Sequence, residues 1–182
     1  IKGESLEAML DREKSLDVPR ALNYGVQILK GVEHAHEAQI LHRDLRPANV
    51  LISESGVVKV ADFGTSRLLE KSHATTVIGS PPYMAPEQFA GRAVLASDIY
   101  SVGVILYQML TGHRPFEADS DLQVLAMHLN AQPKSLRVHA RIPAAVDHVV
   151  LRAMAKRPED RFQSARELRQ ALERAALARD GR

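Results

Sequence analysis

The 182-residue sequence has no cysteine and no tryptophan, and aromatic residues make up only 4% of it. Without cysteine, neither a disulfide framework nor thiolate chemistry is available. A reducing compartment fits this composition, and no signal peptide is visible at Ile1. We therefore expect a cytoplasmic location.

A strong charge excess and long apolar runs are also lacking. The net charge is +2 and no basic tract stands out, so we expect no nucleic-acid partner. The longest apolar stretch, at about residues 99–110, is too short and too interrupted to span a bilayer, so we expect no membrane segment. With 45% hydrophobic residues, the chain is long enough for one domain with a core.

Hydrophobic periodicity predicts a mainly helical α+β fold. Asp17 and Pro19 mark a helix start, and apolar residues then recur at helical spacing at positions 22, 26, 29 and 32. Further helices are predicted at about residues 97–112, 120–130, 144–155 and 164–178. Two short β-like runs, residues 50–52 and 57–60, flank a Glu-Ser-Gly turn and predict a small hairpin.

Three short strings carry the functional signal. Residues 42–49 read His-Arg-Asp-Leu-Arg-Pro-Ala-Asn, residues 62–64 read Asp-Phe-Gly, and residues 85–87 read Ala-Pro-Glu. In this order the chain resembles the C-terminal lobe of a eukaryotic-like (Hanks-type) serine/threonine protein kinase, from Ile1 to about Ala178. The sequences of residues 97–103 and 158–165 are similar to those of bacterial members of this kinase family.

The resemblance also shows what is missing. No glycine-rich loop and no strand lysine precede residue 42, since Lys2, Lys14 and Lys30 lie in other kinds of sequence. The first residue is not methionine, which suggests a start within a longer protein. We therefore expect residues 1–182 to be a partial catalytic domain, with a tail at about 179–182 and its N-terminal lobe upstream. Alone, the chain should be a poor kinase or none.

The resemblance implies ATP- and Mg²⁺-dependent phosphoryl transfer to serine or threonine hydroxyls of protein substrates. Asp44 would accept the proton of the substrate hydroxyl. Asn49 and Asp62 would bind Mg²⁺, because a hard cation prefers oxygen ligands. Arg46 stands where the family usually has lysine and keeps a positive charge for the transferring phosphate. Ser5 would lie near the ATP ribose.

Regulation is expected in the polar loop at residues 68–82. In the resembled family, an arginine beside the catalytic aspartate, here Arg43, marks control by phosphorylation of this segment. A phosphate would give that arginine a charge-assisted partner. Thr75 and Thr76 are the expected phosphorylation sites, and Ser72 is a weaker candidate.

Residues 79–84 resemble the substrate-docking stretch of serine/threonine kinases rather than the corresponding part of tyrosine kinases. Ser80 replaces the commoner threonine and keeps a hydroxyl that can bridge Asp44 and Arg46. The residues assigned to docking are Gly79, Ser80, Pro81 and Tyr83.

Other motif residues are expected to serve structure. His42 and Phe63 would belong to a stacked apolar column, and Glu87 would pair with Arg161. Asp98 would hold the backbone of the catalytic loop, or simply favour a helix N-terminus. The full structural set is His42, Phe63, Gly64, Glu87, Asp98 and Arg161.

Two other functions compete with catalysis. A pseudokinase or interaction module would fit a chain that lacks the upstream lobe, although intact Asp44, Asn49 and Asp62 argue against it. A small-molecule phosphotransferase of related fold would share the catalytic Asp and Asn, but it would lack the Ala-Pro-Glu segment.

Overall fold

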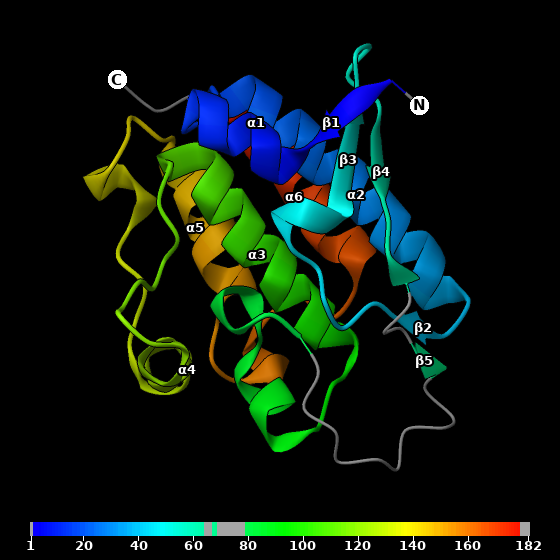
Figure 1. The fold of residues 1–182 in the computed structure, drawn as a ribbon. Helices are drawn as coiled ribbons and strands as arrows, with labels where there is room; N and C mark the ends of the chain where they lie inside the picture. The colour runs from blue at the N-terminus through cyan, green and yellow to red at the C-terminus, as the bar shows by residue number, and fades with distance from the viewer. Residues whose placement is uncertain (1, 64–66, 69–78, 179–182) are drawn as a thin grey trace.

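The structure is a computed structural model that describes residues 2–63, 67–68 and 79–178. Helices dominate it (Figure 1). The α-helices are α1 (Leu6–Glu13), α2 (Val18–Glu37), α3 (Leu95–Thr111), α4 (Asp121–Asn130), α5 (Ala144–Ala153) and α6 (Ala165–Leu177). Short 3-10 turns include η1 (Pro47–Asn49), η4 (Pro81–Tyr83), η5 (Pro86–Ala90), η6 (Leu136–Val138) and η7 (Pro158–Asp160). The predicted mainly helical lobe with a small sheet is confirmed.

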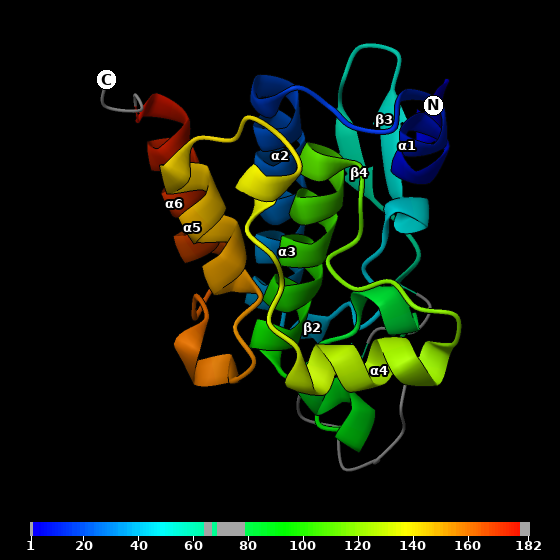
Figure 2. The same cartoon turned by 90° about the vertical axis from the view of Figure 1, so that its left-hand side faces the viewer.

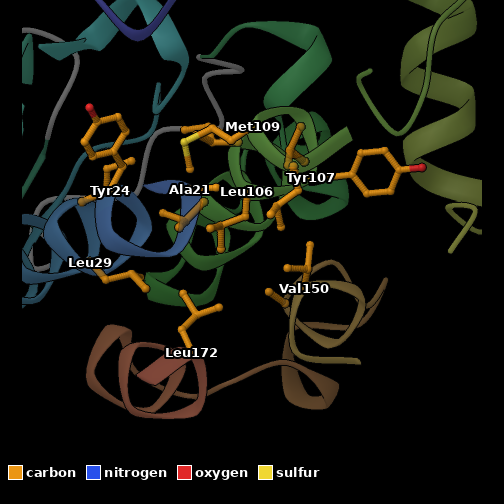
Figure 3. Close-up of a cluster of buried hydrophobic side chains, with 14 of the residues drawn as sticks. Ala21, Tyr24, Leu29, Leu106, Tyr107, Met109, Val150 and Leu172 are labelled. Atoms are coloured by element: carbon orange, nitrogen blue, oxygen red, sulfur yellow. The ribbon is translucent and has the colours of Figure 1, made fainter. Parts of the chain in front are cut away.

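Helix α3 is the centre of the core. Every residue of α3 except Leu95 and Gln108 is buried. It packs against α2 and α5, while α6 packs against those same two helices (Figures 1 and 2). Figure 3 shows side chains of all four helices converging, among them Leu29, Leu106, Val150 and Leu172, each 0% exposed. Burying one such leucine side chain contributes about 1.5–3 kcal/mol relative to leaving it exposed.

Close packing of α3 on α5 depends on Gly103. A Cβ at this position would lie 2.9 Å from Met154 Cγ and 3.0 Å from Ala153 Cβ. Glycine has an unfavourable helix propensity of about 1 kcal/mol relative to alanine. Here that cost is accepted because a side chain would force the two helices apart.

Two small antiparallel sheets lie beside the helices. Strands β3 (Val50–Ser53) and β4 (Val58–Val60) form the predicted hairpin, and β1 (Gly3–Ser5) adds a third strand along β3. Strands β2 (Ile40–Leu41) and β5 (Arg67–Leu68) form the second sheet. In the hairpin turn Gly56 has φ +80°, a conformation that glycine adopts without steric cost.

Helix starts follow the capping pattern of the sequence. The Asp17 carboxylate accepts a hydrogen bond from Arg20 N at the start of α2, and serine hydroxyls cap α1, α4 and α6 in the same way. No helix in the described part of the chain is long and apolar enough to cross a membrane.

Candidate active site

The loop before Asp44 is fixed by one buried carboxylate. Asp98 lies in the first turn of α3 and is 1% exposed. Its Oδ2 accepts from His42 N at 3.0 Å, and its Oδ1 accepts from Arg43 N at 3.0 Å. His36 Nε2 of α2 lies 2.8 Å from Oδ2. Asp98 therefore joins α2 and α3 to the loop that carries the catalytic candidates.

Arg43 needs this support because its backbone is strained. Its φ is +73°, in the left-handed region where residues other than glycine are uncommon. Besides the bond from its N–H to Asp98, its carbonyl accepts from Gln88 Nε2 at 2.9 Å. Gln88 Oε1 in turn accepts from Ala85 N at 3.0 Å. Buried side chains thus hold both backbone polar groups of Arg43.

The Asp44 carboxylate lies between the docking stretch and Arg46. Ser80 Oγ donates to Asp44 Oδ1 at 2.8 Å. Arg46 Nε lies 3.7 Å from Asp44 Oδ2, and the Arg46 side chain is 40% exposed. One carboxylate oxygen is therefore oriented by a hydroxyl, while the other faces a cation at the molecular surface.

Asn49 and Asp62 lie at adjoining ends of the hairpin strands. Val50 pairs with Val60 in the β3–β4 register, and Ala61 N donates to the Asn49 carbonyl at 2.8 Å. Asn49 Nδ2 donates to the Asp44 carbonyl at 2.8 Å, which turns the amide oxygen Oδ1 away from that carbonyl. Asp62 is exposed and has φ +61°.

The side-chain oxygens of Asn49 and Asp62 are suitable ligands for Mg²⁺. One amide oxygen and one carboxylate are hard oxygen ligands, and Mg²⁺ is usually held by one or two protein groups while waters and phosphates complete its shell. Across the described residues, no group of three or more His, Cys, Asp or Glu side chains could hold a metal alone. The set therefore suits a metal that arrives with a nucleotide better than a permanent protein-bound ion.

His42 links the two candidate motifs. Its Nε2 lies 2.8 Å from the Ala61 carbonyl, which can only accept, so Nε2 carries the proton. Nδ1 then accepts from Asp44 N at 3.2 Å. The ring also contacts Phe63, with centroids 4.7 Å apart and the two planes tilted by 60°. His42 is 1% exposed, whereas Phe63 is 37% exposed.

The docking stretch begins at a position only glycine can occupy. Gly79 has φ +138°, and a Cβ there would lie 2.7 Å from Met84 Cγ and 3.1 Å from the Arg43 carbonyl oxygen. Further along, Tyr83 OH donates to Gln108 Oε1 at 2.6 Å. Burial raises the pKa of Tyr83 to about 12, so the phenol stays protonated.

Glu87 and Arg161 form an ion pair in the interior. Arg161 is 0% exposed, and its Nη1 and Nη2 donate to the two Glu87 carboxylate oxygens at 2.7 and 2.9 Å. Arg161 also donates to three backbone carbonyls, and Ser97 Oγ donates to Glu87 Oε1. Burial alone would raise the pKa of Glu87, but the hydrogen bonds and charge of Arg161, together with the hydrogen bond from Ser97, hold that pKa below its usual value.

Some predicted site residues lie elsewhere. Ser5 Oγ accepts from Ala8 N at 3.1 Å and caps α1; its assignment to the ATP ribose stays a prediction. Pro81 lies in η4 beside Ser80. Gly64, Ser72, Thr75, Thr76 and the tail at 179–182 lie outside the described residues.

Sequence reasoning missed two residues that hold the site. Gln88 follows directly after the Ala-Pro-Glu string, so its position beside a known motif was the available signal. His36 sits on the predicted helix, and nothing local in the sequence indicates a partner as distant as Asp98.

The fold and site define a protein kinase lobe, and comparison with known proteins agrees. A family model described as the protein kinase domain matches residues 1–173. The chain therefore belongs to the protein kinase domain family. The predicted resemblance to bacterial serine/threonine kinases is confirmed by its relatives.

Three of those relatives come from different bacteria. Serine/threonine-protein kinase PrkC of Bacillus subtilis is 36% identical over 173 residues, covering 92% of this chain and 27% of that protein. PknB of Mycobacterium tuberculosis (strain CDC 1551 / Oshkosh) is 38% identical over 182 residues, covering 96% and 29%. PksC of Streptomyces coelicolor is 38% identical over 189 residues, covering 98% and 34%. The chain thus spans about a quarter to a third of these relatives.

Proposed function

We propose that the chain is the catalytic lobe of a serine/threonine protein kinase, which transfers the γ-phosphoryl group of ATP to protein hydroxyls with Mg²⁺. The observation that carries the proposal is the arrangement around Asp44. Its carboxylate is oriented by Ser80 of the docking stretch, while its backbone carbonyl accepts from the metal-ligand candidate Asn49. The names of the bacterial relatives support the same reaction.

Each candidate residue has a separate role in the proposed reaction. Asp44 aligns the acceptor hydroxyl and takes its proton as that oxygen bonds to the γ-phosphorus of ATP, while the bond from phosphorus to the bridging oxygen breaks and ADP leaves. Arg46 places a positive charge at the same carboxylate, where the transferring phosphoryl group would pass. Asn49 and Asp62 would hold Mg²⁺, which neutralises phosphate charge when bound. Asp98 and Gln88 fix the loop so that these groups need little reorganisation.

The remaining assignments complete the proposal. Residues 1–182 form the C-terminal part of the catalytic domain, and an upstream lobe supplies the glycine-rich loop and the lysine that contact the phosphates. Phosphate on Thr75 or Thr76 activates the enzyme by pairing with Arg43. Protein substrates bind at residues 79–83, Ser5 lies near the ribose, and the reaction takes place in the cytoplasm.

The test uses the complete protein that carries this chain. It is incubated with labelled ATP, Mg²⁺ and a generic basic protein, and the labelled amino acid in the acceptor is identified. Label on serine or threonine that disappears when the metal is chelated supports the proposal. Absence of label with every acceptor and metal tested, despite nucleotide binding, would favour a pseudokinase instead.

A further inference from the structure

Helix α4 contacts the docking stretch through a buried histidine. Figure 2 shows α4 lying across the direction of α3, and the residues of α4 contact η4. His128, near the end of α4, is 0% exposed. Its Nε2 lies 3.1 Å from the carbonyl oxygen of Pro82, in the middle of the docking stretch.

The hydrogen bonds of the ring fix its tautomer. The Pro82 carbonyl can only accept, so Nε2 carries the proton. Nδ1 lies 2.7 Å from Tyr100 OH and therefore accepts from that phenol. In the neutral ring both nitrogens are satisfied. Burial first, and the nearby Lys156 ammonium second, lower the pKa of His128 to about 4, so the neutral form prevails near pH 7.

The position of the ring is fixed from several directions. Phe116 packs against it edge-on, with centroids 4.9 Å apart, and the Tyr100 ring lies 5.6 Å away. Lys156 Nζ donates to the His128 carbonyl at 2.7 Å and lies 4.5 Å from the centre of the Phe116 ring. The Lys156 carbonyl accepts from Arg161, the partner of Glu87. The end of α4 is thus joined to the Glu87–Arg161 pair.

The hydrogen bond from His128 supports a backbone carbonyl in a turn whose other residues are held by other groups. The neighbours of Pro82 are each held by other contacts, Ser80 by Asp44 and the Tyr83 carbonyl by Ser101 Oγ at 2.7 Å. Proline has no backbone N–H, so a turn of two prolines offers only carbonyls for anchoring. The hydrogen bond from His128 anchors the central carbonyl of this turn from the side of α4.

We propose that His128 is a positioning residue for the protein acceptor: it holds the Pro82 carbonyl, and with it the surface on which the acceptor segment docks. The inference rests on the proposed function, because it assigns acceptor binding to that stretch. His128 is assigned no part in ATP binding or in proton transfer at Asp44.

The experiment measures steady-state kinetics of the complete protein with a basic protein as acceptor. His128→Phe keeps a ring but removes both hydrogen bonds. Losing one buried hydrogen bond should raise the KM for the acceptor about fivefold. The KM for ATP should not change, and kcat should stay within about twofold of the parent enzyme.

Two matched comparisons separate positioning from general stability. His128→Gln can place an N–H near the Nε2 position and should restore most of the acceptor affinity, whereas the shorter His128→Asn should not. Tyr100→Phe removes the other hydrogen bond of the same ring; it should lower the melting temperature but leave the acceptor KM near the parent value. If His128→Phe fails to fold, the Gln and Asn pair carries the test.

An unchanged acceptor KM in folded His128→Phe and His128→Asn would overturn the inference and leave the proposed function standing. Equal changes in acceptor KM for the Gln and Asn variants would also overturn it. A parent protein that phosphorylates no protein would instead remove the proposed function, and this inference with it.

Discussion

Asp62 follows the end of β4 with an exposed side chain and a backbone in the left-handed region. A non-glycine residue held there costs of order 1–3 kcal/mol. The hydrogen bond from Ala61 N to the Asn49 carbonyl ties the neighbouring backbone to the catalytic loop. We propose that this strained backbone is retained because Asp62 binds a metal.

The metal role of Asp62 predicts a specific defect. Asp62→Ala should weaken the affinity for ATP measured with Mg²⁺ far more than the affinity measured without it, because the variant loses the only anionic ligand candidate. Calorimetric titration of the complete protein with and without Mg²⁺ checks this. An identical response to the metal in the parent and the variant would contradict the assignment.

The buried His128 predicts a pH dependence of stability. The pKa of His128 in the folded protein is about 4, which lies below its ordinary value of about 6.5. Between about pH 6.5 and pH 4 this histidine is therefore protonated in the unfolded chain and neutral in the folded chain. Its contribution is therefore complete above about pH 6.5 and is lost as the pH falls toward 4. The groups that face the ring are the Lys156 ammonium and the Tyr100 phenol.

Thermal unfolding of the parent and of His128→Gln across this range measures the effect. The parent should lose more stability than the variant between pH 6.5 and 4, because the amide does not titrate. Parallel curves for the two proteins would show that His128 is not held neutral. The stability that is lost when Glu87 is protonated at low pH is the same in both proteins, so it cancels in the comparison.

At the level of single residues, the sequence predicted those site candidates that lie in recognisable motifs. Asp44, Asn49 and Asp62 stand in motifs whose order and spacing are informative. His128 and His36 were not found, because each is an isolated histidine whose partner is set only by tertiary packing. An isolated polar residue on a helix gives no local sign of what it will contact.

At the element scale, the Glu87–Arg161 pair joins η5 to the segment after η7. Arg161 also donates to carbonyls of Ala96, Ala155 and Lys156, so one side chain holds together the start of α3 and the segment that follows α5. A buried pair is weak evidence for stability as such, yet removing one partner leaves the other charge uncompensated.

Arg161→Leu should therefore destabilise the lobe by about 3–5 kcal/mol. Glu87→Gln is the matched control: it keeps an acceptor for Arg161 and Ser97 while removing the negative charge. Denaturant unfolding gives both free energies. A loss below about 1 kcal/mol for Arg161→Leu would mean that the pair is not an organising contact.

Element prediction succeeded where the pattern is long. Helices α2, α3, α4, α5 and α6 were located by apolar spacing and end signals, and β3–β4 by its turn. The short helix α1 and strand β1 were not predicted as separate elements. Strands β2 and β5 have two residues each, and the paired residues Ile40 and Leu68 are 28 positions apart, so no local pattern could reveal them.

At the scale of the whole molecule, we propose that the catalytic candidates face a second lobe that contacts the phosphates. No glycine-rich loop precedes Asp44, and none of Lys2, Lys14 and Lys30 takes the place of a strand lysine at the site. Lys30 lies on α2. Phe63 keeps 37% of its surface exposed beside the site.

Residues 1–182 alone should therefore transfer phosphate far more slowly than a chain extended upstream. Without the lobe that covers the phosphates, ATP is neither closed off from water nor held in line with the acceptor. Initial rates of transfer to the same basic protein, measured for both chains at equal concentration, check this. Comparable rates would show that the described lobe contains the whole active site.

We propose that Asp44 receives the proton of the acceptor hydroxyl during phosphoryl transfer. The most direct measurement compares phosphate transfer by the complete protein and by its Asp44→Asn variant, with thermal unfolding as the control for folding. Asparagine keeps the shape and an acceptor for Ser80 but cannot take the proton. We expect the variant to transfer phosphate about 10²–10⁴-fold more slowly, with a nearly unchanged melting temperature. Transfer by the folded variant within about twofold of the parent rate would contradict it.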